Sequence, residues 1–305
     1  ALVISFFTAL LFAIHPVQVE TVCWISASKI VLSTFFYLSA LICYIQYMRN
    51  SKWQYLLASV VSSILAMGCK EQSVIIVPCL LLFDWMLFKR NMRSLKVYIE
   101  KVYYLIPAIA IFIVTLVANK DTGEEIIGYT IVDRFIFLCY SVFKYLLISA
   151  IPFKLSYLYP FPFQVGEKIP MALWIYPFVI LFIGYVIYLN RRKPLLVFCT
   201  LFFILHLLPV LHVIPLPRYV VVADRYLYIP YIAFAIGLSI LSYHLYERQR
   251  KWILYAGFLY CSYLCVYTAS YAPAWKNSDT LKEHFKEVLK KRETNLSINF
   301  KHEKQ

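Results

Sequence analysis

The sequence predicts an all-α protein whose helices cross a membrane several times. Of its 305 residues, 62% are hydrophobic and only 15% are charged, whereas soluble domains carry about 25% charged residues. The mean hydropathy of +0.69 arises from many separate apolar runs of helix length. Because lipid offers no hydrogen-bond partners to the backbone, only helices or closed barrels cross it, and these runs are longer than barrel strands.

The distribution of charge favours a membrane topology over nucleic-acid binding. The formal net charge is +14, but the basic residues stand in short clusters between apolar runs. This is the pattern in which positive loops remain in the cytoplasm. We therefore expect a lipid bilayer as a partner and no nucleic acid. The eight cysteines lie mostly inside apolar runs and form no metal-binding spacing, so we predict neither a disulfide framework nor a metal site.

The first two apolar runs are expected to be spanning helices. Residues 1–14 form the first, and it ends at His15 because the following proline disfavours helical conformation in the residue before it. Residues 29–48 form the second, and the basic residues just after it mark the cytoplasmic side. Since the chain opens at Ala1 inside an apolar run, we expect this membrane domain, residues 1–270, to be incomplete at its N-terminus.

Three further crossings follow, at residues 54–69, 73–88 and 98–118. A short polar link, Lys70-Glu71-Gln72, joins the first two of them. The densest basic loop of the chain precedes the third and is expected in the cytoplasm. The loop after the third crossing is acidic and suits the outside.

Residues 134–151 are apolar enough to cross the membrane, but they admit a second interpretation. If they cross, two later basic clusters fall outside; if they lie flat or re-enter on the outer side, both fall in the cytoplasm. We prefer the second alternative because the loop bias then holds throughout. The segment becomes an outer interfacial helix, followed by an aromatic, proline-rich outer loop.

The last crossings are expected at residues 173–189, 195–210, 226–245 and 252–270. The predicted total is about nine spanning helices plus one outer interfacial helix. The polar tail, residues 271–305, then lies outside the cytoplasm. Apolar residues recur at helical spacing within residues 279–292, which predicts a helix there.

Four polar groups fall at the outer ends of spans in this topology and predict a single outward-facing cavity. They are His15 with Glu20, Lys70 with Glu71, Arg218, and Asp224 with Arg225. Each also has a structural interpretation, as a helix end, an interfacial ion pair or a salt bridge that fixes a loop. Ionisable residues at such depths are functional candidates because they are costly unless paired or hydrated.

The chemistry of these residue types suits a phosphate-bearing ligand. Arginine binds phosphate oxygens bidentately, so Arg225 is the first candidate, and Lys70 offers a point charge. His15 titrates near neutral pH and is a candidate hydrogen-bond partner or base. Tyr228 is a candidate substrate contact or an interfacial aromatic. By contrast, Asp84 lies at a cytoplasmic helix end beside basic residues, and we interpret it as structural.

Five stretches together resemble the transmembrane and tetratricopeptide-repeat O-mannosyltransferase family and its bacterial relatives. The run LLFAIHPVQVETVCWISASK is similar to the signature FALHPV-VE-V-WI of that family. The others, in order, are LAMGCKEQSVIIVPCLLLFDWML, FKYLLISAIPFKLSYLYPFP, LLPVLHVIPLPRYVVVADRYLYIP and APAWKNSDTLKEHF. The resemblance covers nearly the whole chain, and the ordered set is more specific than any one piece.

The resemblance implies a membrane glycosyltransferase of the GT-C fold that needs no cofactor. Such an enzyme moves a mannose-like sugar from a polyprenyl-phosphate donor to a hydroxyl of a protein or glycan acceptor, on the extracytoplasmic or lumenal side. It implies Arg225 and Lys70 as donor phosphate ligands, and substrate contacts from His15, Glu20, Glu71, Asp224 and Tyr228. The membrane would be the plasma membrane in a bacterium and the endoplasmic reticulum in a eukaryote, and residues 271–305 would begin the tetratricopeptide repeats.

Two departures from the family pattern leave other functions open. The family's catalytic carboxylate lies in the first outer loop, which would be upstream of Ala1. The family also usually has an acid after the lysine that corresponds to Lys29, whereas this chain has Ile30. The alternatives are a non-catalytic transporter or scaffold, or an inactive fragment of such an enzyme. A transporter should show broken helices in two related halves, and the sequence contains no internal repeat.

Overall fold

The computed structural model describes residues 2–118, 128–156, 159–211, 220–248 and 250–283, and in these ranges every regular element is a helix. This confirms the predicted all-α class. An isolated antiparallel bridge between Tyr159 and Val222 is the nearest approach to strand pairing among the described residues. The predicted helix at residues 279–292 lies largely outside the described ranges.

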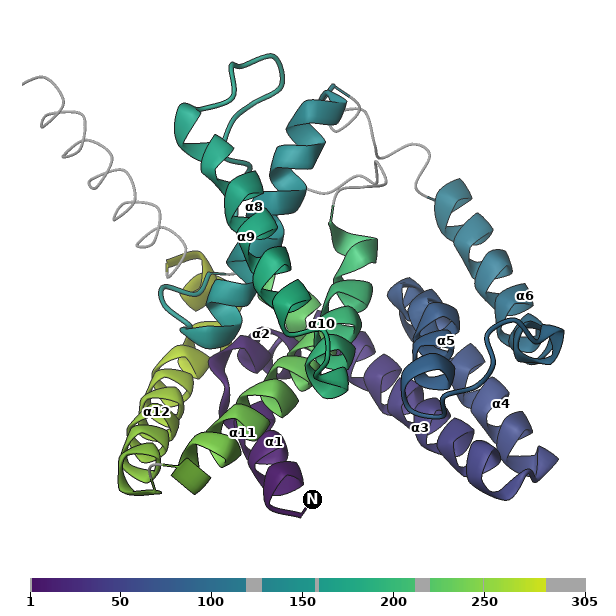
Figure 1. Ribbon diagram of the computed structural model, residues 1–305. Helices are drawn as coiled ribbons and strands as arrows, with labels where there is room; N and C mark the ends of the chain where they lie inside the picture. Colours follow the sequence, from purple (N-terminus) through teal and green to yellow (C-terminus); the bar gives the residue numbers. More distant parts are fainter. Residues whose placement is uncertain (1, 119–127, 157–158, 212–219, 249, 284–305) are drawn as a thin grey trace, which may run out of the picture.

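The N-terminal half forms a helical group on one side of the molecule (Figure 1). The α-helices of this group are α3 (Ser28–Asn50), α4 (Trp53–Cys69), α5 (Ile76–Met86) and α6 (Leu95–Ala118). The 3-10 helix η3 (Glu71–Ile75) joins α4 to α5. Helix α3 packs along α4, and α6 packs against both α4 and α5. Ser51, in the left-handed conformation at φ 55°, ends α3 and allows the chain to reverse into α4.

The second group joins the start of the chain to its C-terminal helices. Its α-helices are α1 (Leu2–Ile14), α2 (Val19–Cys23), α10 (Pro194–Leu207), α11 (Pro230–Arg248) and α12 (Arg250–Tyr271). Its short 3-10 helices are η1 (Pro16–Gln18), η2 (Ile25–Ala27), η6 (Leu208–Val210), η7 (Asp224–Leu227) and η8 (Ala272–Trp275). Helix α11 packs against α1, α10 and α12, and α10 also contacts α5, so α10 links the two groups.

Helices α8 (Ile131–Ala150) and α9 (Ile175–Leu189) pack against each other, and η5 (Met171–Trp174) leads into α9. A capping box, in which Thr130 and Asp133 bond each other's main chain, begins α8. Helix α9 has no buried residue, although its sequence is almost entirely apolar. Such an exposed apolar surface is typical of contact with a bilayer.

Four helices are long and apolar enough to cross a membrane: Ile25–Asn50, Leu95–Ala118, Met171–Leu189 and Trp252–Trp275. The pair Leu2–Ile14 and Pro16–Cys23 qualifies as a fifth if its two parts, bent by 55°, are one span. Two more predicted crossings, Trp53–Cys69 and Pro194–Val210, are apolar helices of shorter length. The structure therefore supports a membrane protein with several spans, and the predicted count of nine goes beyond these four or five.

Helix α3 separates two polar clusters, one near each of its ends. Ile30 near its start packs against Tyr228, whereas Tyr44 near its end joins the charged loop that follows α5. Fourteen residues of helix separate these positions by roughly 20 Å. Polar clusters at the two ends of α3 thus lie far apart, and they are called the outer and inner clusters below.

Candidate functional site

The outer cluster consists of Glu20, Tyr159, Asp224 and Arg225. Pro16 bends the chain between α1 and α2, and the bend brings η1 and α2 into contact with η7. Glu20 on α2 thereby reaches Asp224 and Arg225 on η7, about two hundred residues later in the chain. Tyr159 arrives from a third direction, because its main chain bridges to Val222 just before η7.

Glu20 and Arg225 form a buried ion pair at the centre of the outer cluster. Nη1 of Arg225 lies 2.5 Å from Oε1 of Glu20, and the main-chain N–H of Arg225 donates to Oε2 at 2.9 Å. The Glu20 side chain is fully buried, whereas that of Arg225 remains 20% exposed. Both carboxylate oxygens are engaged by Arg225, so Glu20 holds the arginine in place.

The guanidinium of Arg225 has binding capacity beyond Glu20. It lies over the rings of Trp24 and Tyr226, at 5.5 and 5.0 Å from their centroids. A guanidinium carries five N–H donors in a planar fork. The bond to Glu20 and the contact with Tyr226 leave donors for a further anion, and the exposed part of the side chain gives access to it.

Asp224 is a completely buried carboxyl with one engaged oxygen. The hydroxyl of Tyr159 donates to Oδ1 at 2.9 Å. For Oδ2, the described part of the chain provides no hydrogen-bond partner. Burial raises the pKa of Asp224 well above its ordinary value, and the nearby Glu20 carboxylate adds to the rise. Burial in this position therefore disfavours the ionised form of Asp224.

His15 and Tyr228, two of the predicted site residues, adjoin the elements of this cluster: η1, which His15 caps, contacts η7, and Tyr228 directly follows η7. His15 is fully buried, its Nδ1 accepts the N–H of Val17 at 3.2 Å, and its ring packs on Tyr231 at 4.3 Å between centroids. Tyr228 is 9% exposed and packs with Ala27 at the start of α3. These two residues thus border the outer cluster, and His15 also caps η1, which was its alternative structural interpretation.

Lys70 and Glu71 form a separate pair. Their Nζ and Oε1 atoms lie 2.6 Å apart, with Lys70 16% and Glu71 43% exposed. Lys29 at the start of α3 adds its positive charge near Glu71. No hydrogen bond or ion pair among the described residues joins this pair to the outer cluster. The residues that were predicted to share one cavity therefore form two separate polar groups. Arg218, the remaining predicted residue, lies outside the described ranges.

Sequence reasoning missed several polar residues of this region. Gln18 and Thr21 are buried, and in the described ranges neither the amide of Gln18 nor the hydroxyl of Thr21 has a partner. Their spacing of three places them on one helical face beside Pro16, a signal that was available in the sequence. Tyr159 carried no such signal, because its bond to Asp224 joins positions 65 residues apart.

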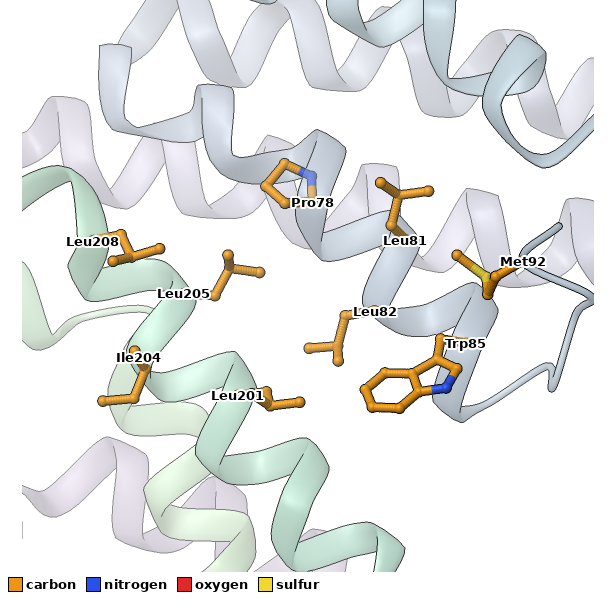
Figure 2. A pocket seen from close by; sticks show the side chains of 9 residues that line it. All are labelled: Pro78, Leu81, Leu82, Trp85, Met92, Leu201, Ile204, Leu205 and Leu208. Carbon is orange, nitrogen blue, oxygen red and sulfur yellow. The ribbon is translucent and has the colours of Figure 1, made fainter. Parts of the chain in front are cut away.

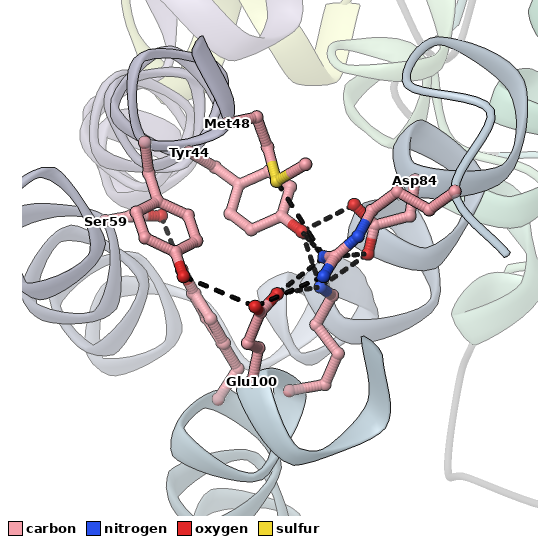
Figure 3. Close-up of polar contacts among 9 residues, drawn as sticks. Tyr44, Met48, Ser59, Asp84 and Glu100 are labelled. Atoms are coloured by element: carbon pink, nitrogen blue, oxygen red, sulfur yellow. Dashed lines mark hydrogen bonds and ion pairs between the residues drawn. The ribbon is translucent and has the colours of Figure 1, made fainter. Parts of the chain in front are cut away.

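The inner cluster consists of Tyr44, Asp84, Arg90, Glu100 and Lys101 (Figure 3). Lys101 and Arg90 lie 2.6 and 3.3 Å from Oδ2 of Asp84, and Tyr44 donates to Oδ1 at 2.6 Å. Arg90 also forms a fork with both oxygens of Glu100, at 2.5 and 3.2 Å. Two acids thus face two bases, and every carboxylate oxygen is bonded. This agrees with the structural interpretation of Asp84.

The inner cluster fastens three helices and a loop. Tyr44 belongs to α3, Asp84 to α5, Glu100 and Lys101 to α6, and Arg90 to the basic loop between α5 and α6. The Lys101 ammonium also lies 4.6 Å from the centre of the Tyr44 ring. Removing one partner from such a group leaves a buried charge uncompensated, which is strongly destabilising.

Comparison of the chain with protein-family models, with curated proteins and with solved structures finds no match. The geometry of the two clusters and the sequence motifs are therefore what supports a function.

Proposed function

We propose that the protein is a membrane glycosyltransferase that transfers a mannose-like sugar from a polyprenyl-phosphate donor to a hydroxyl of a protein or glycan. The observation that carries this proposal is the outer cluster. It pairs a buried carboxylate with an accessible arginine and keeps a second buried acid beside them, one of whose oxygens has no partner among the described residues. A phosphate-bearing ligand at a lipid surface matches this combination of positive charge and donors.

Each residue receives a role from its contacts. Arg225 binds the donor phosphate and stabilises its charge as the sugar leaves. Glu20 is a positioning residue, because both of its oxygens hold Arg225. Asp224 hydrogen-bonds the sugar or acceptor through Oδ2, which has no partner among the described residues, and His15 and Tyr228 form the wall of the site. Lys70 and Glu71 form the second, more exposed group on the donor side.

We further propose several features of fold and topology for this enzyme. They are the GT-C fold, nine spanning helices and an extracytoplasmic tail that begins tetratricopeptide repeats. The plasma membrane of a bacterium or the endoplasmic reticulum of a eukaryote is the proposed location. The position of the outer cluster at the opposite end of α3 from the basic loop supports chemistry on the extracytoplasmic side.

A non-catalytic scaffold is the second candidate, and one observation favours it. Arg225 already has a carboxylate partner at hydrogen-bond distance, as a purely structural arginine would. The two functions differ in what they demand of the remaining guanidinium donors. A scaffold needs only the charge, whereas phosphate binding needs the planar fork.

Replacement of Arg225 by lysine distinguishes the two. The full-length protein, purified into nanodiscs, is given polyprenyl-phosphate [3H]mannose, and transfer of label to a hydroxyl-bearing acceptor protein is measured. We expect Arg225→Lys to lower kcat/KM by about 100-fold, since it removes a bidentate contact to developing charge. The control is Arg49→Lys, an exposed position at the end of α3, which should leave transfer unchanged. Unaltered transfer by Arg225→Lys would contradict the phosphate assignment.

A further inference from the structure

A groove lined by apolar side chains lies between α5 and α10 (Figure 2). Its volume is about 450 Å³, and nine residues line it, all with nonpolar side chains apart from the indole nitrogen of Trp85. Figure 2 shows Pro78 and Leu82 on the side of α5 that faces Leu205 and Leu208, which belong to α10 and η6. None of these side chains offers a charge, so the groove suits a hydrocarbon ligand.

The groove runs from the inner-cluster side of the molecule toward the outer-cluster side. Trp85 and Met92 close one end, and Trp85 directly follows Asp84 of the inner cluster. Pro78 and Leu208 lie at the other end, where α10 contacts η3. Along α5, the distance from Pro78 to Trp85 is roughly 10 Å, so the groove follows about two turns of helix.

Positive charge gathers where the outer end of the groove meets η3. Lys70 immediately precedes η3 and is mostly buried, while its partner Glu71 is half-exposed. Lys29 is near the same carboxylate. Two cations therefore face one anion, which leaves a net positive charge beside the apolar groove. A ligand with a hydrocarbon chain and an anionic head matches an apolar groove that ends at a positively charged region.

We propose that this groove binds the single prenyl chain of the donor, whose head leaves the groove past Lys70 and Lys29 toward the phosphate site at Arg225. The proposal rests on the proposed function, because it names the donor-binding surface of the same enzyme. A gap between two helices accommodates one chain, which fits a polyprenyl phosphate better than a two-chain phospholipid. The start of α3 carries Lys29 and packs against Tyr228, so it connects this head end to the outer cluster.

Photocrosslinking in nanodiscs that contain the full-length protein tests the proposal. The probe is a polyprenyl phosphate with a diazirine in its chain, and a phosphatidylcholine with the same diazirine is the comparison. Labelled peptides are mapped by mass spectrometry. We expect the prenyl probe to label α5 and α10, and excess unlabelled polyprenyl phosphate to compete. Labelling of other helices, or equal labelling by the phospholipid without competition, would overturn the proposal.

A substitution that fills the groove supplies the second measurement. Leu81→Trp should reduce prenyl labelling and raise the KM for the donor by about tenfold, because the indole displaces about two methylene groups of chain. The control is Leu181→Trp on α9, where the leucine is 70% exposed on the apolar surface. Specific labelling of α5 and α10 without sugar transfer would refute the proposed function but support prenyl-chain binding in the groove. If Leu81→Trp leaves sugar transfer unchanged and the probe labels other helices, prenyl-chain binding in the groove is refuted, whereas the proposed glycosyltransferase function stands.

Discussion

The inner and outer clusters both bury two acids and an arginine, yet they differ in how far their polar atoms are paired. In the inner cluster, Asp84 and Glu100 each receive bonds on both oxygens. In the outer cluster, Asp224 keeps one buried oxygen without a partner among the described residues. A buried polar atom left unpaired costs free energy, so natural proteins retain few of them and often where function uses them.

Charge balance shows the same difference. The inner cluster sets Arg90 and Lys101 against two carboxylates, whereas the outer cluster sets Arg225 alone against Glu20 and Asp224. Burial and the neighbouring Glu20 carboxylate raise the pKa of Asp224, so the second acid of this cluster disfavours its ionised form. A complete network serves to hold helices together, and an incomplete one retains donors for a ligand.

The largest expected effect on stability is in the inner cluster. Asp84→Asn leaves Arg90 and Lys101 with one carboxylate, and we expect the free energy of unfolding to fall by about 3–5 kcal/mol. Thermal and denaturant unfolding in detergent micelles measures the change. The double variant Asp84→Asn with Lys101→Met restores the charge balance and should recover much of the loss. If the single variant unfolds like the wild type, the inner cluster does not fasten the helices.

Glu20→Gln is expected to have a smaller effect on stability, because Arg225 is partly exposed and can turn toward water. The predicted loss is about 1–3 kcal/mol, the cost of leaving one buried partner unpaired. Transfer activity should fall further than stability, since Glu20 positions Arg225. Glu71→Gln is the matched control at a half-exposed ion pair, where about 0.5 kcal/mol is expected. If Glu20→Gln lowers the free energy of unfolding no more than Glu71→Gln does, the buried ion pair stabilises the fold no better than the half-exposed one.

The smallest change in stability is expected for Asp224→Asn below pH 3.8, under about 1 kcal/mol, because a neutral amide then replaces an acid that is protonated in both the folded and the unfolded state. The pH dependence should change more. The folded-state pKa lies above the ordinary 3.8, so the native state holds the proton more tightly. Its contribution to stability is therefore full below pH 3.8 and is lost as the pH rises through the folded-state pKa. When the free energy of unfolding is measured across this pH range, it should decline with rising pH in the wild type and not in Asp224→Asn. The same decline in both proteins would contradict the raised pKa of Asp224.

Local patterns predicted the fold class, the helix break at His15-Pro16 and the relevance of Asp224-Arg225. They also indicated that Glu20 belongs to the outer side. They could not supply the pairing of Glu20 with Arg225, because the two residues lie 205 positions apart and only the packing of α2 on η7 joins them. The inner cluster was similarly hidden: Lys101 appeared to be one residue of an apolar run, and its bond to Asp84 depends on how α6 crosses α5.

The most direct test compares the same substitution in both clusters. Arg225→Lys and Arg90→Lys each keep the charge and remove the planar fork, and the Kd for polyprenyl phosphate is measured for each purified variant by native mass spectrometry in nanodiscs. We predict that Arg225→Lys weakens binding by about tenfold, whereas Arg90→Lys leaves the Kd unchanged and lowers the unfolding temperature. The reverse pattern, with binding lost in Arg90→Lys and kept in Arg225→Lys, would contradict the assignment of the outer cluster as the functional site.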